Sequence, residues 1–417
     1  MTCRAGEAAG TRRPSPNEDI GGTMKISGFE TLYCNAGWRN LSFLKITTDE
    51  GLVGWSEFPE NHINNVLSPL VGHLTQQIVG EDPRRIHPLI DRLRRASWGV
   101  PFGAVSRAIG AIENALVDIK AKSMGVPAYE LIGGMMRDSI RMYWSHCGSY
   151  HVTNWKDLGV PRITSLDDVK MLGRQVRESG YHALKTNLMM FDKPEPYMYR
   201  PGFAGGSGDP DRNPTRAAIS AAVDQMAAFR EGAGPEVGIK LDINFNFRPE
   251  GYLRMARALE PLDLEWLEID NFDAKAVAQV RRGSNIPIAS CETLSGRRQL
   301  RPFLEENAVD VVIIDVPWNG IYEAMRMAAL ADAFEVNVAT HNFCGPIATL
   351  ISAHFCAAVP NFRVMEMDVV QVPWTNELIT QAPRIENGHM RLPGGPGWGA
   401  DIDEEALKAY PPVAAKH

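Results

Sequence analysis

Hydrophobic and polar residues alternate along the first patterned part of the chain, which begins at Met24. Three alternating runs predict an antiparallel β-meander, and they cover residues 25–34, 40–51 and 52–58. Residues 60–134 change to a helical pattern, which is clearest over 104–125, where apolar residues recur at spacings of three and four. We therefore assign residues 24–138 to an N-terminal α+β domain.

After residue 138 the pattern consists of short apolar runs rich in β-formers, separated by amphipathic stretches that predict helices. Eight such runs predict strands: 139–147, 181–190, 236–245, 264–270, 286–292, 309–316, 334–342 and 362–370. Eight strands that alternate with helices over about 250 residues are typical of an α/β fold, the closed (β/α)₈ barrel of the TIM type, whereas open parallel sheets usually contain fewer strands. We assign residues 139–385 to this barrel.

The two ends of the chain lack the periodicity of the barrel. Residues 1–23 are rich in Gly, Pro and polar residues, which predicts a disordered leader. Residues 386–417 end in a short helical pattern, and we expect them to return to the N-terminal α+β domain.

A third irregular segment, residues 188–214, interrupts the barrel pattern. It lies between Lys185 and Asp242, which are 57 positions apart, although a whole βαβ unit needs only about 30 residues. Its Pro, Gly and aromatic residues favour a lid over the mouth of the barrel, and plain disorder is the alternative.

Composition narrows the class of protein and of partner. The 417 residues include 43 Lys and Arg against 50 Asp and Glu without a long basic run, which argues against nucleic acid as a partner. No apolar stretch approaches the ~18 residues of a membrane span. The six cysteines stand singly without a C-x-x-C pair, which indicates reduced thiols. These features predict a globular cytoplasmic protein.

Acidic residues end three consecutive predicted strands. Asp242, Glu268 and Glu292 are separated by 26 and 24 positions, one βα unit each time. The carboxyl ends of barrel strands meet at one mouth, so we expect the three carboxylates to converge there. A cation would relieve their repulsion, and an all-oxygen ligand set favours Mg²⁺, with Mn²⁺ as the alternative, over zinc. Each acid taken singly is equally compatible with a helix cap or a salt bridge.

The next two predicted strands carry Asp315 and His341. An aspartate behind an imidazole fixes its tautomer and raises its basicity, as a general base requires. A core histidine and a capping aspartate are the alternatives. Lys185, on the second predicted strand, is expected on the opposite side of the barrel, where desolvation and a nearby cation would depress its pKa. Pairing of this lysine with one of the acids is the alternative.

The order and spacing of these residues resemble those of the enolase superfamily, and within it the mandelate racemase-like branch. The resemblance is carried by 111–134, Lys185, Asp242-x-Asn244, Trp266-Leu267-Glu268, 287–292, Asp315, His341, Glu366 and 395–407. It implies an enzyme in which the N-terminal region and the C-terminal segment form a capping domain on the barrel, and a homo-oligomer. It also implies the following site: Mg²⁺ on Asp242, Glu268 and Glu292, a His341–Asp315 dyad, Lys185 across the substrate, and Glu366 at the substrate carboxylate.

The reaction implied by the resemblance is removal of the proton α to a carboxylate through an enediolate. Loss of a β-hydroxyl then makes the enzyme a hydro-lyase that converts a sugar acid, an aldonate or an aldarate, into a 2-keto-3-deoxy acid. A racemase, epimerase or cycloisomerase of a carboxylate substrate is the alternative. A Schiff-base aldolase and a non-catalytic binding protein are disfavoured, because the three carboxylates and the dyad are all present.

The chain departs from the branch at two places. The common Lys-x-Lys is here Lys185-Thr186-Asn187, so the usual base on that face is missing and dehydration is favoured, with His341 acting on an R-configured α-carbon. Ile269-Asp270 replace the acidic residue and proline that usually follow the acid at the position of Glu268.

Candidate substrate-binding residues lie at or beyond the strand ends and in the loops. They are Asn187, Asn244, Glu366, Trp38, Arg39, His62, Trp144, His146 and Trp374. Aromatic rings against sugar-like faces, with Arg and His at hydroxyls or a distal carboxylate, suit a polyhydroxy acid. For the aromatic, Arg and His residues, surface exposure or core packing is the alternative.

Overall fold

Eight parallel strands close into a barrel in the structure, a computed structural model that describes residues 24–60, 66–203 and 212–413. In order around the barrel the strands are β4 (Ile140–Ser145), β5 (Ala183–Asn187), β8 (Gly238–Asp242), β9 (Trp266–Glu268), β10 (Ile288–Ser290), β11 (Val311–Asp315), β12 (Asn337–His341) and β13 (Phe362–Asp368). Pairing of β13 with β4 closes the ring. Each strand lies inside one predicted run, so the (β/α)₈ fold is confirmed. The predicted leader, 1–23, lies outside the described residues.

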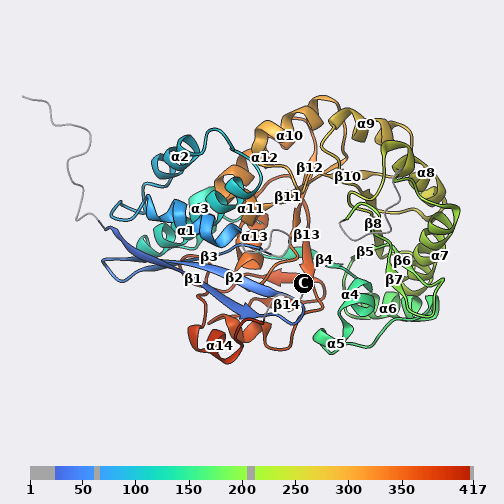
Figure 1. Ribbon diagram of the computed structural model, residues 1–417, viewed down its shortest axis with the longest axis horizontal. Coiled ribbons are helices and arrows are strands. Elements are labelled where there is room, and N and C mark those ends of the chain that lie inside the picture. The colour runs from blue at the N-terminus through green and yellow to red at the C-terminus, as the bar shows by residue number, and fades with distance from the viewer. Residues whose placement is uncertain (1–23, 61–65, 204–211, 414–417) are drawn as a thin grey trace, which may run out of the picture.

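Helices cover the outside of the barrel (Figure 1). The longer ones are α6 (Leu166–Glu178), α7 (Arg216–Ala233), α8 (Pro249–Leu259), α9 (Ala274–Arg282), α10 (Gly296–Glu305), α12 (Ile321–Asp332) and α13 (Pro346–Ala358). Short elements fill the connections: α4 (Ser149–Thr153), α5 (Trp155–Leu158), η2 (Glu260–Leu262), α11 (Val316–Asn319) and η3 (Thr375–Leu378). Side-chain caps stabilise the N-termini of two of these helices. Ser165 and Asp168 form a capping box at the start of α6, and the Thr215 side chain accepts a hydrogen bond from the Ala218 N–H at the start of α7. Across the described ranges, no helix combines the length and the apolar character needed to cross a membrane.

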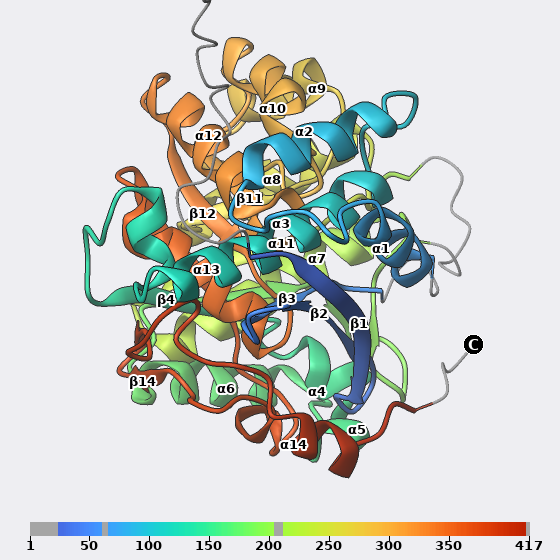
Figure 2. The same ribbon diagram turned by 90° about the vertical axis from the view of Figure 1, so that its left-hand side faces the viewer.

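The N-terminal domain is a three-stranded antiparallel sheet beside helices, at the left of Figure 1 and toward the viewer in Figure 2. Its elements are β1 (Ile26–Asn35), β2 (Asn40–Thr48), β3 (Val53–Glu57), α1 (Leu67–Gln76), α2 (Ile86–Ala96), α3 (Ala104–Ser123) and η1 (Ala128–Ile132). Helix α3 contacts both β3 and α11, so it lies between the sheet and the barrel. The predicted meander and long helix are confirmed as a cap on the barrel.

The last part of the chain contacts both the barrel and the cap. The hairpin of β14 (Arg384–Glu386) and β15 (His389–Arg391) pairs antiparallel with β4. Further on, the backbone N–H of the buried Trp398 donates to Asp118 Oδ1 at 3.0 Å, and its indole Nε1 donates to the Trp55 carbonyl at 2.8 Å. Gly397 is required at this contact, because its φ is +68° and a Cβ would lie 2.0 Å from Asp118 Oδ1. Helix α14 (Glu404–Ala409) then contacts β1.

Side chains that face the inside of the barrel form an apolar layer below a charged layer. The apolar layer contains Tyr143, Ala183, Trp266, Ala289, Val311, Ile313, Ala339 and Val364. Because side chains alternate along a strand, residues two positions further on face the same way and lie nearer the mouth. They include Ser145, Lys185, Glu268, Asp315, His341 and Glu366. Strand β10 departs from this alternation. Its functional acid, Glu292, comes three positions after the inward Ala289 instead of two, and Cys291 between them has a φ of +94°.

The described part of the irregular segment 188–214 is tied to the barrel. It contains a two-stranded ribbon, β6 (Met189–Met190) with β7 (Tyr197–Met198). The Tyr199 N–H donates to the Leu188 carbonyl at 2.9 Å, and the Gly202 N–H donates to Asn246 Oδ1 at 3.1 Å. The middle of the predicted lid, 204–211, lies outside the described residues.

Glu57, at the end of β3, joins the cap to the barrel. Its buried carboxylate accepts hydrogen bonds from the backbone N–H groups of Gly345 and Ala348, at the start of α13. A negative charge is stabilised at a helix N-terminus. A Cβ at residue 345 would lie 2.6 Å from Leu41 Cδ1 and 2.7 Å from Glu57 Oε1, so the close approach requires glycine.

We expect Glu57→Ala to lower the free energy of unfolding by about 2–3 kcal/mol, because two buried N–H groups lose their acceptor. Urea unfolding followed by circular dichroism measures this loss. Glu50→Ala, in the exposed turn between β2 and β3, is the control and should change stability little. Equal losses in the two variants would contradict the role of Glu57 in joining the domains.

Glu113 makes a second contact of this kind, from α3 to the start of α12. Its Oε1 accepts from the Tyr322 N–H at 3.0 Å, and burial raises the pKa of Glu113 from 4.5 to about 7. A carboxyl whose pKa is raised by folding stabilises the protein fully below its unfolded pKa and loses this contribution as the pH rises through the folded pKa.

We therefore compare the free energies of unfolding of the wild type and of Glu113→Gln. As the pH rises from 5 to 8, the wild type should lose about 3 kcal/mol relative to the variant. Gln keeps an oxygen for the Tyr322 N–H and does not titrate. Urea unfolding of both proteins at the two pH values measures the difference. A difference between the proteins that does not change with pH would refute the raised pKa.

Candidate active site

Lys185 lies within the charged layer at the mouth of the barrel. Its Nζ is 2.7 Å from Glu268 Oε1 and 3.0 Å from Glu366 Oε1, and Asp242 Oδ2 is 3.9 Å away. Burial acts to lower the pKa of Lys185, but the charges of Glu268 and Glu366 outweigh it and raise this pKa well above the ordinary value. The lysine is thus paired with acids, the alternative that the sequence also allowed, and without a cation its pKa is raised instead of depressed.

The structure brings Asp242, Glu268 and Glu292 to the same end of the barrel. Asp242 and Glu268 are in register on the adjacent strands β8 and β9. Burial raises the pKa of Asp242 to about 6, helped by the charge of Glu292, and it raises the pKa of Glu268 to about 7, helped by the charge of Asp242. Burial and the charge of Glu268 also raise the pKa of Glu292. The three carboxylates thus repel one another.

The donor set of this cluster fits a hard divalent cation, because it consists of carboxylates whose repulsion a cation would relieve. Beside it lies Asp270, which is 2% exposed and has no hydrogen-bond partner among the described residues on either carboxylate oxygen. The Glu268 carboxylate faces Lys185 and also accepts from Trp266 Nε1 at 2.9 Å. In the structure the ammonium of Lys185 lies among these carboxylates, and within the described ranges no three His, Cys, Asp or Glu side chains are close enough together to hold an ion.

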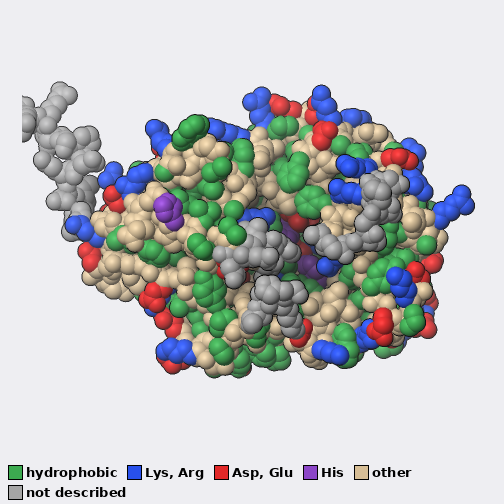
Figure 3. Space-filling view, viewed as in Figure 1, with side chains coloured by type: hydrophobic (Ala, Val, Ile, Leu, Met, Phe, Trp, Pro, Cys, Tyr) green, Lys and Arg blue, Asp and Glu red, His purple; other side chains and the backbone are tan. Residues whose placement is uncertain are grey.

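His341 and Asp315 form a hydrogen-bonded pair on the adjacent strands β12 and β11. His341 Nδ1 is 2.7 Å from Asp315 Oδ2, and the Trp318 N–H donates to Asp315 Oδ1 at 2.7 Å. Burial acts to lower the pKa of His341, but the charge of Glu292 and the hydrogen bond to Asp315 raise it to about 10. The other ring nitrogen, Nε2, is 3.6 Å from Glu292 Oε2 and is the one left to exchange a proton. Figure 3 shows histidine and acidic side chains deep in a hollow of this face.

Glu366, on β13, completes the charged layer. The Asn342 N–H donates to its Oε2 at 2.7 Å, and the Ser145 hydroxyl donates to its Oε1. Burial acts to raise the pKa of Glu366, but the charge of Lys185 lowers it well below its usual range. Glu366 is therefore an ionised hydrogen-bond acceptor.

Asn187 and Asn244 support the Asp242 loop. Asn187 Nδ2 is 3.1 Å from the Asp242 carbonyl and 3.4 Å from Asn244 Oδ1, and its own Oδ1 accepts from Ser149 Oγ at 3.0 Å. The Asn244 N–H donates to Asp242 Oδ1 at 2.9 Å. Asn187 carries no titratable group, so it cannot serve as a base on this face.

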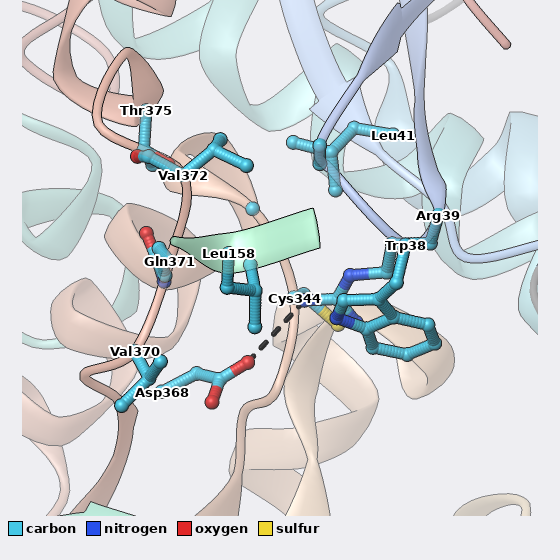
Figure 4. Close-up of a pocket in the computed structure, with 12 residues that line it drawn as sticks. Trp38, Arg39, Leu41, Leu158, Cys344, Asp368, Val370, Gln371, Val372 and Thr375 are labelled. Atoms are coloured by element: carbon cyan, nitrogen blue, oxygen red, sulfur yellow. Dashed lines mark hydrogen bonds and ion pairs between the residues drawn. The ribbon is translucent and has the colours of Figure 1, made fainter. Parts of the chain in front are cut away.

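A second polar cluster lies where the cap meets the barrel mouth (Figure 4). Arg39 Nη2 is 3.4 Å from Asp368 Oδ2, and the Tyr150 hydroxyl donates to the same oxygen at 3.0 Å. His146 stacks on Tyr150 with ring centroids 4.9 Å apart, and Trp38 packs on the same ring at 5.6 Å. In the described part of the chain, Arg39 Nη1 and Asp368 Oδ1 are buried without a hydrogen-bond partner. Asp368 Oδ1 lies 3.7 Å from His146 Nδ1, so Asp368 joins the residues of this cluster from the cap and from the barrel.

Three predicted substrate-binding residues are not part of these clusters. Trp144 lies between the inward Tyr143 and Ser145 and packs against Tyr181 on the outer face of β4, with ring centroids 5.7 Å apart. The Trp374 ring stacks on Tyr410 at 4.7 Å, and its Nε1 donates to the Asn35 carbonyl at 2.9 Å. His62 lies outside the described residues.

The sequence interpretation missed several residues of the mouth. Asp368 comes two positions after Glu366, so strand alternation could have indicated it. Tyr150 and Arg107 come from a short helix and from the cap, where no sequence signal pointed to the site. The Arg107 guanidinium lies 3.4 Å over the Trp318 ring, which is 5.1 Å from the His341 ring.

Comparison with known proteins matches both parts of the fold. Residues 168–406 match the enolase C-terminal domain-like family, and residues 31–133 match the N-terminal domain of the mandelate racemase / muconate lactonizing enzyme family. A D-xylonate dehydratase of Haloferax volcanii is 31% identical over 375 residues, which cover 88% of this chain and 84% of the relative. A D-galactonate dehydratase of Ralstonia nicotianae is 29% identical, over 91% of this chain and 93% of the relative.

Solved structures of other proteins share the fold of this chain. A protein of Burkholderia xenovorans strain LB400, provisionally named L-alanine-DL-glutamate epimerase, superposes with a TM-score of 0.91 and 45% identity, over 94% of this chain and 99% of its own. A second structure under that name is bound to magnesium and fumarate. The matched domains cover the barrel and the cap, and the chain is thus an enzyme of the mandelate racemase / muconate lactonizing enzyme family, within the enolase superfamily.

Proposed function

We propose that the protein is a Mg²⁺-dependent hydro-lyase that dehydrates a sugar acid, an aldonate or an aldarate, to a 2-keto-3-deoxy acid. The observation that carries the proposal is the His341–Asp315 pair, whose Nε2 points to the carboxylate cluster, together with the absence of a base at Asn187. The dehydratase names of the Haloferax and Ralstonia relatives support this reaction class. The five cysteines of the described residues are free and buried, which supports a cytoplasmic location.

Asp242, Glu268 and Glu292 would hold the cation. When bound, Mg²⁺, with Mn²⁺ as the alternative, would stabilise the negative charge that develops on the substrate carboxylate as the α-proton leaves. The magnesium in the Burkholderia structure supports this assignment.

Lys185 supplies a second positive charge at the substrate carboxylate. Its ammonium is paired with two buried carboxylates, and in this proposal it stays protonated and donates hydrogen bonds instead of removing a proton. It is held between Glu268 and Glu366, so its position is set before substrate binds.

His341 transfers the proton. The charge of Glu292 contributes to the raised pKa of His341, and a cation held by Glu292 would offset that charge and favour the neutral imidazole. In that form Nε2 accepts the α-proton while Asp315 holds the ring through Nδ1 and stabilises the imidazolium. The imidazolium then returns the proton to the departing β-hydroxyl, so that water and an enol leave the reaction and the enol becomes the 2-keto acid. One base therefore suffices for dehydration.

A racemase or epimerase is the second candidate, favoured by the provisional name of the Burkholderia protein. It needs a base on the face opposite His341, and Lys185 is the residue available there. Its two carboxylate partners favour the protonated ammonium and oppose that role.

The experiment is a screen of aldonic and aldaric acids with Mg²⁺, read by semicarbazide detection of 2-keto acids, with EDTA and with His341→Asn as controls. Formation of a keto acid from one stereochemical series, dependent on both metal and His341, would support the proposal. In parallel, α-deuterium exchange in D₂O is followed by NMR. Exchange without any keto acid would exclude the dehydratase and favour the epimerase.

A further inference from the structure

Asp270 is a buried carboxylate that the proposed reaction does not use. It lies two residues beyond Glu268, the last residue of β9, and 2% of its surface is exposed. Neither carboxylate oxygen has a hydrogen-bond partner among the described residues, and no salt bridge within 4.0 Å reaches it there. An ionised carboxylate buried in this way is strongly unfavourable unless a positive charge compensates it.

The backbone around Asp270 is fixed, so the orientation of the side chain is set by the fold. The Asp270 N–H donates to the Asn244 carbonyl at 3.1 Å, and the Tyr252 hydroxyl bridges the carbonyls of Asn244 and Asp270, at 2.6 and 3.2 Å. Since residues i and i+2 share a face of an extended chain, the Asp270 side chain follows that of Glu268 toward the mouth. Burial and the negative charges of Glu292, Asp242 and Glu268 raise the pKa of Asp270 well above its ordinary value, and the charge of Lys185 acts in the opposite direction.

Lys185 acts on Asp270 only from a distance, because no lysine, arginine or histidine of the described residues forms an ion pair with Asp270. Lys185 is already paired with Glu268 and Glu366, and His341 with Asp315. A divalent cation among Asp242, Glu268 and Glu292 would lie beside Asp270 and would supply the missing positive charge.

We propose that Asp270 is a fourth carboxylate of the divalent-cation centre. This inference rests on the proposed function, in which Asp242, Glu268 and Glu292 hold the cation. As an ionised carboxylate beside Asp242, Glu268 and Glu292, Asp270 would add to the negative charge that binds the cation. Groups beside the direct ligands of a metal commonly change its affinity by 10–100-fold.

The test is a titration of the metal-stripped full-length protein with Mn²⁺, in which electron paramagnetic resonance measures free Mn²⁺. We expect Asp270→Asn to bind Mn²⁺ at least about tenfold more weakly than the wild type. Asp368→Asn, which removes a buried carboxylate bound to Arg39 and Tyr150, is the matched control and should keep the wild-type affinity for Mn²⁺. Glu292→Gln, at a proposed direct ligand, should lose affinity.

Thermal unfolding in EDTA provides an independent readout. Without metal, Asp270→Asn should be as stable as the wild type or more so, because an uncompensated charge is removed, while Mn²⁺ should raise its melting temperature less. If the Asn variant does not fold, Asp270→Ala is used in the same titration. Unchanged affinity in the Asp270 variant together with a loss in Glu292→Gln would overturn the inference and leave the proposed function standing. Absence of Mn²⁺ binding by the wild type would overturn both.

Discussion

Replacing His341 by Asn is expected to lower kcat on the order of 10⁴-fold, the upper range for loss of a general acid–base group. His341 is the only group in the proposed reaction that both accepts the α-proton and returns it to the leaving hydroxyl. Asn can keep the hydrogen bond to Asp315 through its amide, so the barrel mouth should remain intact. The loss would then report the proton transfer and not a collapse of the site.

The measurement combines steady-state kinetics on the sugar acid found in the screen with α-deuterium exchange in D₂O. Both should be lost in His341→Asn. The control is His389→Asn. His389 lies in β15, which pairs with the start of β4 at the end of the barrel opposite the mouth, so its loss should leave both activities unchanged. If exchange persisted in His341→Asn while keto acid was lost, another base would remove the α-proton and the assignment of His341 would be wrong.

The second large effect is expected from Lys185→Met in the metal-free protein. Removing the ammonium leaves Glu268 and Glu366 buried without their cation, and breaking a buried ion pair in this way costs about 3–5 kcal/mol. Because a divalent cation can supply the missing charge, Mg²⁺ should stabilise Lys185→Met more than it stabilises the wild type.

Urea unfolding with EDTA and with Mg²⁺ measures these two differences. Lys240→Met is the matched control, because Lys240 is in register with Lys185 on the adjacent strand β8, is fully buried, and pairs with Glu265. The Lys240→Met variant should also have a lower free energy of unfolding than the wild type. The increase in that free energy on adding Mg²⁺, however, should equal the increase in the wild type. Equal Mg²⁺ responses in all three proteins would argue against a cation among the carboxylates that surround Lys185.

The positions of the strands and the order of the charged residues could be predicted from the sequence. Each barrel strand is a short apolar run between amphipathic helices, and Asp242, Glu268, Asp315 and His341 are the last residues of their strands, whereas Lys185 and Glu366 lie within theirs. In a (β/α)₈ barrel the chain returns to the same mouth after every unit, so regular spacing in sequence becomes proximity in space. For this reason Asp242 and Glu268 are neighbours in the structure, and His341 contacts Asp315.

The orientation of individual side chains was harder to predict. Trp144 was expected to contact substrate, but alternation along β4 places its ring outside the barrel, because Tyr143 and Ser145 take the inward positions. A shift of one residue along a strand moves a side chain to the opposite face of the sheet. A run of large side chains such as Met142-Tyr143-Trp144 contains no charged residue that would show which face is inside.

The sequence by itself determined the fold class, the cap and the identity of the residues at the strand ends, because these depend on local periodicity and on repeated spacing. Only the tertiary structure decided the ion pairs of Lys185, since its carboxylate neighbours come from three other strands. The same holds for the contact of Arg39 with Asp368, which are 329 positions apart, and for the isolation of Asp270. Electrostatic free energy depends on distances between side chains, and only the folded chain sets those distances.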